Sequence, residues 1–199
     1  MTTVVDETIK DMCVRLEAFQ TPRWAIDSIL DVELTTRYIV DPCCGLGAIG
    51  AVCRERLLDV EEFDIERWAD HFPDRQRGEP WIQDFLKWWR PMEMETVIMN
   101  PPFSLAEEFV SHAQVLGARK IICFQRQAWR ESAGRRLWWE QNAPARVWVC
   151  GARAPCWRFD MLGTEKADKG SFPTSYAWYV WERGHKGAEI TSAIYPRGK

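Results

Sequence analysis

The chain has 199 residues, of which 46% are hydrophobic and 28% charged, and its formal net charge is −3. These values predict one globular domain over 1–199 and exclude disordered and fibrous proteins. No apolar run is long enough to cross a bilayer, and the polar, acidic start 1–10 does not resemble a secretory signal. The seven cysteines include no Cys-x-x-Cys pair, which argues against a disulfide scaffold and a structural zinc site. We therefore expect a cytoplasmic protein with reduced thiols and no metal.

Short apolar runs alternate with helical stretches along the chain, a pattern typical of α/β sheets with crossover helices. Helices are predicted at 23–30, 48–58, 105–116 and 128–141. Strands are predicted at 38–40, 60–63, 81–82, 96–99, 120–124, 146–150 and 176–181, with 190–195 beside them. We expect a Rossmann-like, doubly wound, mostly parallel seven-stranded sheet with helices on both faces. Residues 151–174 show no period, which predicts a long surface loop and a candidate substrate-contacting insertion.

The net charge conceals an uneven distribution. Residues 1–118 carry 11 Lys and Arg against 22 Asp and Glu, whereas residues 119–158 carry 9 against 2. Tryptophans interleave with this basic segment, and guanidinium groups beside aromatic faces suit phosphate contact and base stacking. Each residue alone is more simply a solvated arginine or a core tryptophan, but the asymmetry as a whole favours nucleic acid. The candidate nucleic-acid contacts are Arg126, Arg130, Arg153, Trp157 and Arg158.

Polar residues follow four successive predicted strands, at Asp41, Asp64, Asp84 and Asn100. Ligands of doubly wound sheets bind beyond the carboxyl ends of the strands, so we expect these side chains to meet at one site. Asp41 opens a glycine-rich turn that ends at Gly47, and its spacing matches neither the dinucleotide fingerprint nor the phosphate-binding loop. A carboxylate before the glycines suits a cationic or hydroxyl-bearing ligand.

The segment Asn100-Pro101-Pro102-Phe103 is the most specific signal. Its two prolines fix the backbone and lack N–H donors, so the segment presents carbonyl oxygens. Asn100 adds a side-chain acceptor, and Phe103 adds an aromatic face. Such a segment is suited to accept hydrogen bonds from a planar amine and to stack on the ring that carries it.

Taken in order, these motifs resemble those of class I S-adenosylmethionine-dependent methyltransferases. Within that class they are similar to the small phage-type enzymes that methylate adenine N6 in DNA. The resemblance covers roughly residues 17–125 and rests on Phe19-x-Thr21-Pro22, Asp41-Pro-x-x-Gly-x-Gly47, Asp64, Asp84-Phe85 and Asn100-Pro-Pro-Phe103. It implies S-adenosylmethionine as cofactor, DNA or RNA as partner, and a bacterial or phage-encoded source.

The resemblance also implies roles for individual residues. Those implied to bind the cofactor are Phe19, Thr21, Pro22, Asp41, Pro42, Cys43, Gly45, Gly47, Asp64, Asp84 and Phe85. Asp64 matches the ribose-binding acid, with Glu66 as a competitor for that role. The catalytic residues are Asn100, Pro101, Pro102 and Phe103. In this mechanism the Asn100 side-chain oxygen and the Pro101 carbonyl accept hydrogen bonds from the amine, and Phe103 stacks on a base that is flipped out or already single-stranded.

Two departures from the family pattern stand out. The Cys43-Cys44 pair occupies positions where small residues are commoner, and we expect a structural role for it. The chain also leaves little room for a separate target-recognition domain, so a partner or a second copy is a candidate source of specificity.

Two other readings remain open. In the first, the acceptor of the methyl group is an RNA base or a protein glutamine. The basic segment argues mildly against a protein acceptor, which would not require it. In the other, the chain is a non-catalytic binding or regulatory subunit with a methyltransferase fold. The presence of Asp41, Asp84 and Asn100 together argues against this second alternative.

Overall fold

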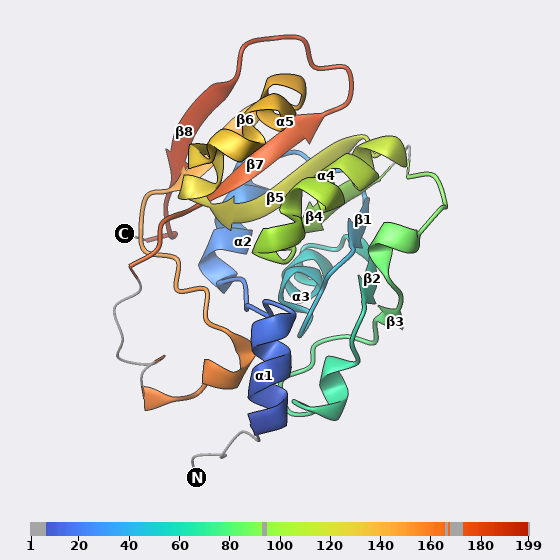
Figure 1. Ribbon diagram of the computed structural model, residues 1–199, viewed down its shortest axis with the longest axis vertical. Coiled ribbons are helices and arrows are strands. Elements are labelled where there is room, and N and C mark those ends of the chain that lie inside the picture. The colour runs from blue at the N-terminus through green and yellow to red at the C-terminus, as the bar shows by residue number, and fades with distance from the viewer. Residues whose placement is uncertain (1–6, 93–94, 166, 168–172, 199) are drawn as a thin grey trace.

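The computed structural model describes residues 7–92, 95–165, 167 and 173–198 (Figure 1). In this part of the chain an eight-stranded sheet has the order β3-β2-β1-β4-β5-β7-β6-β8. Its strands are β1 (Tyr38–Asp41), β2 (Asp59–Asp64), β3 (Trp81–Ile82), β4 (Thr96–Met99), β5 (Lys120–Arg126), β6 (Arg146–Cys150), β7 (Tyr176–Glu182) and β8 (Ile190–Ile194).

The predicted mostly parallel, doubly wound sheet is confirmed. Strands β3, β2, β1, β4 and β5 are parallel, and β7 is antiparallel to both of its neighbours. The predicted count of seven strands is wrong, because Ile190–Ile194 pairs with β6 along five residues and forms an eighth. This pairing satisfies backbone groups that an edge strand would leave open.

Helices cover both faces of the sheet (Figure 1). The α-helices are α1 (Glu7–Arg15), α2 (Arg23–Val32), α3 (Ala48–Glu55), α4 (Ala106–Val115) and α5 (Arg136–Gln141). The short 3-10 turns are η1 (Trp68–Asp70), η2 (Phe85–Lys87), η3 (Phe103–Leu105), η4 (Gln127–Glu131), η5 (Ala133–Arg135) and η6 (Phe159–Met161). Apolar residues of α2 and α3 pack in one core cluster, whereas those of α4 and α5 pack in another. Alternate strand residues point to opposite faces, which is why one sheet supplies both clusters.

Two predicted helices are shorter or more interrupted than expected, and one observed helix was not predicted. Helix α1 was not predicted, although Ile9, Met12 and Cys13 recur at helical spacing and pack in one cluster with Phe159. The helix predicted at 48–58 ends at Glu55, since Leu57 has a φ of 60°. The helix predicted at 128–141 is instead two 3-10 turns followed by α5, because the backbone is extended at Ser132. None of the described helices is long and apolar enough to span a membrane.

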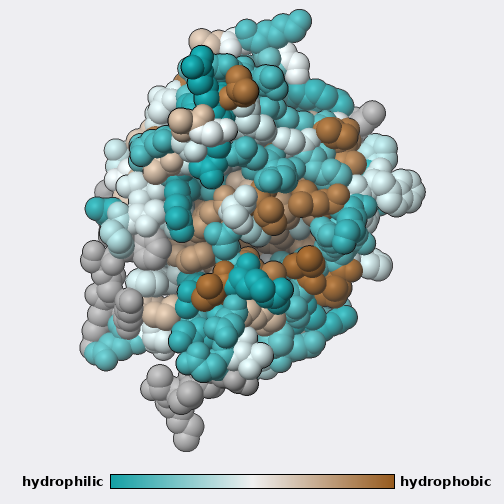
Figure 2. Space-filling model, in the orientation of Figure 1, coloured by the Kyte–Doolittle hydropathy of each residue, from teal (hydrophilic) through white to brown (hydrophobic). Residues whose placement is uncertain are grey.

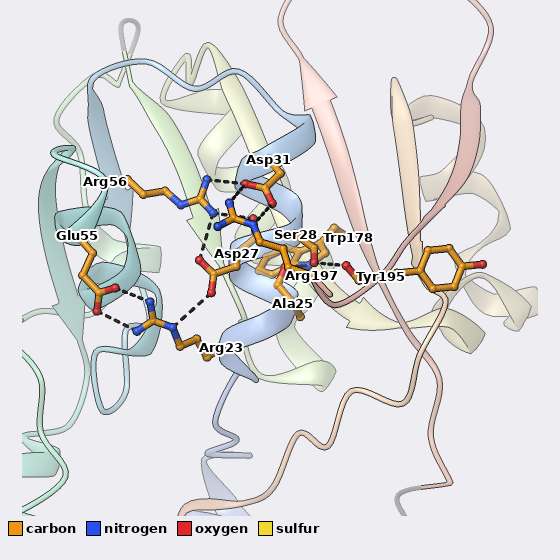
Figure 3. Close-up of polar contacts among 10 residues, drawn as sticks. All are labelled: Arg23, Ala25, Asp27, Ser28, Asp31, Glu55, Arg56, Trp178, Tyr195 and Arg197. Carbon is orange, nitrogen blue, oxygen red and sulfur yellow. Dashed lines mark hydrogen bonds and ion pairs between the residues drawn. The ribbon is translucent and has the colours of Figure 1, made fainter. Parts of the chain in front are cut away.

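A chain of ion pairs ties α2 to α3 and to the C-terminal segment (Figure 3). Its members are Arg23, Asp27, Asp31, Glu55, Arg56 and Arg197. On the buried side of α2, Trp178 Nε1 donates to the Ala25 carbonyl at 3.1 Å. Because α2 starts directly after Thr21 and Pro22, these contacts also hold that dipeptide against the carboxyl edge of the sheet.

Candidate active site

A cleft of about 230 Å³ opens at the carboxyl edge of the sheet. It lies between the strand ends, the residues that follow α1, the start of α4 and η6. Figure 2 shows apolar surface in the middle of this face, between α4 and α1. Nine predicted site residues line the cleft: Phe19, Pro42, Cys43, Gly45, Asp64, Asp84, Phe85, Asn100 and Pro102. Thr21 lines a small adjoining cavity of about 20 Å³, and Pro22, Asp41, Gly47, Pro101 and Phe103 lie outside both linings.

The Asn100 carboxamide, just after β4, is held in one orientation. Its Nδ2 donates to the Phe19 carbonyl at 3.1 Å and to Thr21 Oγ1 at 3.0 Å, and it lies 3.8 Å from Cys156 Sγ. The Phe19 carbonyl can only accept, so the amino end of the carboxamide faces it, with Thr21 Oγ1 and Cys156 Sγ on the same side, and Oδ1 points the other way. Oδ1 is buried and has no hydrogen-bond partner among the described residues. Since a buried acceptor without a donor costs free energy, this atom is the natural place for a ligand N–H.

The two residues that flank Pro102 are less available than the sequence suggested. The Pro101 carbonyl accepts a hydrogen bond from Gln125 Nε2 at 3.3 Å, so one of its two lone pairs is already used. Phe103 is only 9% exposed and packs against Phe19, with 5.1 Å between the ring centroids. The Pro101 carbonyl therefore has its second lone pair left for a further hydrogen bond.

The turn from β1 to α3 depends on its glycines. Gly45 and Gly47 have φ angles of 55° and 78°, in the left-handed region that favours glycine. A Cβ at Gly47 would lie 2.7 Å from the Arg77 carbonyl oxygen, and one at Gly45 would lie 2.5 Å from the Phe159 ring. The predicted glycine-rich turn is confirmed. Its glycines allow the backbone to lie against Phe159 and Arg77 of the same chain.

Asp64, at the end of β2, lines the cleft but is already well hydrogen-bonded. Its Oδ2 accepts from Gly45 N at 2.8 Å, and its Oδ1 accepts from Glu66 N at 3.0 Å and from Trp68 Nε1 at 3.1 Å. Burial nevertheless raises the pKa of Asp64 to about 6. The competitor Glu66 lies outside the cleft lining, with its carboxylate 3.4 Å from His71 Nε2.

Asp41 is a wholly buried carboxyl group behind the cleft. Its Oδ1 accepts from Cys43 N at 3.4 Å, and its Oδ2 has no hydrogen-bond partner in the part of the chain that the structure describes. Burial first, and then the charge of Glu62 beside it on β2, raises the pKa of Asp41 well above its usual range. No grouping of acids, histidines and cysteines among the described residues has the arrangement of a metal site.

Asp84 and Phe85 follow β3 and start η2. Asp84 Oδ1 accepts from Leu86 N at 3.1 Å, which caps the turn, while Oδ2 pairs with Lys87 at 3.0 Å. The Phe85 ring is 2% exposed and packs against Phe109, with 5.3 Å between centroids. Asp84 therefore retains acceptor capacity at the cleft, and the Phe85 ring belongs mainly to the core.

Several cleft residues were not predicted. Glu17 follows α1 in a left-handed conformation, with a φ of 48°, and its Oε2 accepts from Ser104 N at 2.8 Å and from Ser104 Oγ at 2.6 Å. Both residues line the cleft, together with Arg15 and Trp68. No sequence signal marks Glu17, because a single glutamate before a motif has no diagnostic spacing.

The segment 151–174 was predicted as a surface loop, but its described part folds back onto the cleft. Gln20 N donates to the Trp157 carbonyl at 2.8 Å, and Phe159 N donates to the Ala18 carbonyl at 2.9 Å. Phe159 then packs beneath the cleft and lines it. Residues 166 and 168–172 of this segment lie outside the described residues.

The tryptophans of the basic segment lie mostly in the protein core. Trp129 contacts the rings of Trp138 and Trp139 at centroid distances of 5.5 and 4.7 Å, and it also packs against Tyr179 and Trp181. Trp129 and Trp139 are each less than a tenth exposed. These side chains stabilise the α4 and α5 face of the sheet and are not presented for base stacking.

The five predicted nucleic-acid contacts differ in how free they are. Arg130 pairs with Glu189 through two contacts of 2.8 Å, and Arg158 pairs with Asp160 at 2.5 and 2.8 Å. Exposed Arg153 donates to the Pro173 carbonyl at 2.6 Å, and half-buried Trp157 accepts from Gln20 N through its carbonyl but does not line the cleft. Exposed Arg126 lies over the Phe103 ring, with its Cζ 4.3 Å from the ring centroid. The role of these five residues stays a prediction.

No family model matches the sequence, and no curated protein is significantly similar to it. Solved structures are similar in fold, however. A predicted O-methyltransferase from Agrobacterium tumefaciens matches with a TM-score of 0.56 and 15% identity, over 89% of each chain. The methyltransferase subunit of a type I restriction-modification system from Streptococcus thermophilus matches with a TM-score of 0.58 and 11% identity, over 88% of this chain and 47% of that one.

A third similar structure is a tRNA (uracil-54, C5)-methyltransferase from Pyrococcus abyssi in complex with S-adenosyl-L-homocysteine. It has a TM-score of 0.52 and 15% identity, over 78% of this chain and 36% of that one. Identities this low establish a shared fold. The chain therefore has the Rossmann-like α/β fold of class I methyltransferases.

Proposed function

We propose that this chain is an S-adenosylmethionine-dependent methyltransferase that methylates an exocyclic amine, with adenine N6 in DNA as the best-fitting acceptor. The observation that carries the proposal is the Asn100 carboxamide. Its amino end is held by Phe19 and Thr21, and its unpartnered Oδ1 belongs to a residue that lines the cleft. An oriented acceptor of this kind suits a substrate N–H.

The residues of the cleft fit the cofactor. Asp64 and Asp84 bring carboxylate oxygens to the lining, where hydroxyl and amino groups of a nucleoside can donate to them. Bound S-adenosylmethionine supplies a methyl group that its sulfonium has already activated. The S-adenosyl-L-homocysteine bound to the similar tRNA methyltransferase supports this choice of cofactor.

Asn100 and Pro101 would act on the acceptor amine. A hydrogen bond from the amine to Asn100 Oδ1 draws the nitrogen lone pair away from conjugation with the ring, and a second one can use the free lone pair of the Pro101 carbonyl. Both oxygens also stabilise the positive charge that develops on nitrogen during transfer. Because the carboxamide is already oriented, little reorganisation is needed when the acceptor enters.

Nucleic acid is the preferred acceptor because exposed arginines lie near the catalytic motif. Arg126 contacts Phe103 directly, and Arg153 lies on the segment that follows β6 toward the cleft. Restriction-modification and tRNA methyltransferases among the similar structures support the same choice. An RNA base, a protein glutamine or no acceptor at all would be distinguished by the following experiment.

The test is transfer of a labelled methyl group to duplex DNA, single-stranded DNA, RNA and protein, followed by nucleoside and amino-acid analysis. We expect N6-methyladenine in DNA. Asn100→Ala should reduce turnover by about 100-fold or more, while the dissociation constant of S-adenosylmethionine changes little. Asn142→Ala is the matched control, since Asn142 donates to the Trp138 carbonyl away from the cleft.

Each acceptor outcome has one meaning. Label in RNA or glutamine would replace the DNA assignment and leave the methyltransferase proposal intact. Cofactor binding without transfer to any acceptor would support a binding subunit. Near-normal transfer by Asn100→Ala would refute the role given to the carboxamide.

A further inference from the structure

The Phe103 ring is surrounded by protein groups, although it belongs to the proposed catalytic motif. Phe19 and Tyr176 pack against it, at centroid distances of 5.1 and 6.1 Å. The Arg126 guanidinium lies over the ring, with 4.3 Å from Cζ to the centroid. Arg126 is exposed, whereas Tyr176 is buried, so the guanidinium is the outermost of these covering groups.

Arg126 also differs from its neighbours in charge pairing. Arg130 pairs with Glu189, Arg135 with Glu107, and Arg136 with Glu140. Arg126 has no carboxylate partner in the part of the chain that the structure describes. It ends β5, next to the parallel strand β4 that leads into Asn100. A guanidinium without a carboxylate partner among the described residues therefore lies on an aromatic ring beside the candidate acceptor site, where it also hydrogen-bonds to the Tyr176 side chain.

We propose that Arg126 is an exchangeable cover of Phe103. In the free protein its planar guanidinium occupies the ring face that a nucleobase would use. When a base enters, the guanidinium leaves the ring and pairs with a phosphate of the same nucleic-acid strand. The inference rests on the proposed function, since it assigns Phe103 to the acceptor base.

The physical chemistry of the exchange is favourable. An exposed cation–π contact is weak, whereas stacking of a base on an aromatic ring is stronger. The guanidinium also gains a phosphate, which it can contact through two parallel hydrogen bonds. A nucleoside without phosphate gives the displaced guanidinium no new partner. For that acceptor the Arg126 guanidinium only competes with the base for the Phe103 ring. Removing Arg126 should therefore affect nucleosides and oligonucleotides in opposite directions.

The experiment compares adenosine with a short adenine-containing oligodeoxynucleotide, by NMR titration and by methyl transfer. For Arg126→Ala we expect the affinity for adenosine to rise between about two- and fivefold, which corresponds to loss of an exposed cation–π contact. Its KM for the oligonucleotide should rise about tenfold, and the dependence of log KM on log salt should become shallower by about one. Arg126→Lys should keep the gain with adenosine and recover much of the oligonucleotide affinity, because it keeps the charge without the planar group.

Arg37→Ala is the charge-matched control. Arg37 is exposed, pairs with Asp59 at 2.8 Å and precedes β1 at the opposite edge of the sheet. It should change neither acceptor's affinity.

Parallel losses with both acceptors, or no change with either, would overturn the inference. A wild-type protein that binds neither probe would overturn it as well. If the variants show the opposite shifts in binding but no methyl is transferred, the cover is supported and the proposed activity fails. If methyl is transferred to DNA but Arg126→Ala leaves the binding of both acceptors unchanged, the proposed activity is supported and the cover is refuted.

Discussion

Thr21→Val tests whether the hydroxyl of Thr21 orients Asn100. Thr21 is 5% exposed, and its Oγ1 accepts one of the two good hydrogen bonds from Asn100 Nδ2, at 3.0 Å; the Phe19 carbonyl accepts the other at 3.1 Å. Valine has nearly the same shape but no acceptor. Loss of one neutral hydrogen bond costs about 1 kcal/mol, which is about fivefold in rate if the bond orients the carboxamide for transfer.

The assay is single-turnover methyl transfer, with the dissociation constant of S-adenosylmethionine measured separately by calorimetry. We expect a transfer rate reduced by about threefold to tenfold and an almost unchanged cofactor affinity. Thr21→Ser restores the hydroxyl and should recover most of the rate. An unchanged rate together with a clearly weaker cofactor affinity would show that the hydroxyl contacts the cofactor and would refute the orienting role.

Three further predictions concern stability. Gly47→Ala should lower the free energy of unfolding by about 2 kcal/mol or more, because residue 47 has a φ of 78° and its new Cβ would lie 2.7 Å from the Arg77 carbonyl oxygen; equal thermal stability would contradict this. Burial raises the pKa of Asp64 to about 6 from its ordinary 3.8, so the folded protein holds that proton more tightly than the unfolded chain. The extra stability that this proton gives the folded state is lost progressively as pH rises from about 3.8 through about 6. Urea unfolding near pH 5 should therefore give a larger free energy of unfolding than near pH 7.5, by about 1.4 kcal/mol from this group; a smaller free energy of unfolding at pH 5 than at pH 7.5 is the opposing result. Arg158→Ala should cost about 1–3 kcal/mol of stability, because it leaves the carboxylate of Asp160 buried and unpaired; undiminished stability with weaker DNA binding would instead assign Arg158 to the nucleic acid.

Local sequence patterns predicted most of the sheet. Strands at 38–40, 96–99 and 120–124 appear where the apolar runs indicated, because buried parallel strands must be apolar on both faces. The four strand-end residues also follow from these positions, since parallel strands end at one edge. The helix predicted at 128–141 failed at Ser132, where the backbone is extended although the residues on either side favour helix.

The site was predicted only in part. Asp64, Asp84 and Asn100 line the cleft as expected, whereas Asp41 proved to be a buried carboxyl group behind it. Glu17 and Phe159 line the cleft through long-range contacts, since the Glu17 carboxylate accepts from Ser104 and Phe159 N donates to the Ala18 carbonyl. Such contacts depend on how α1 and η6 pack, which short motifs do not encode.

The sequence by itself determined the α/β class, the parallel sheet and the edge at which the ligand-binding residues gather, because these follow from the period of apolar residues and from the turns that end each strand. Tertiary structure alone decided which polar groups are free. Arg130 is neutralised by Glu189, which is distant in sequence, and Arg158 is neutralised by Asp160, which is close in sequence. The Arg126 guanidinium lies on the Phe103 ring, and Asn100 Oδ1 has no hydrogen-bond partner among the described residues. The physical reason is that the partners of a charged or hydrogen-bonding group are set by three-dimensional packing, whereas its chemical type is set by the sequence.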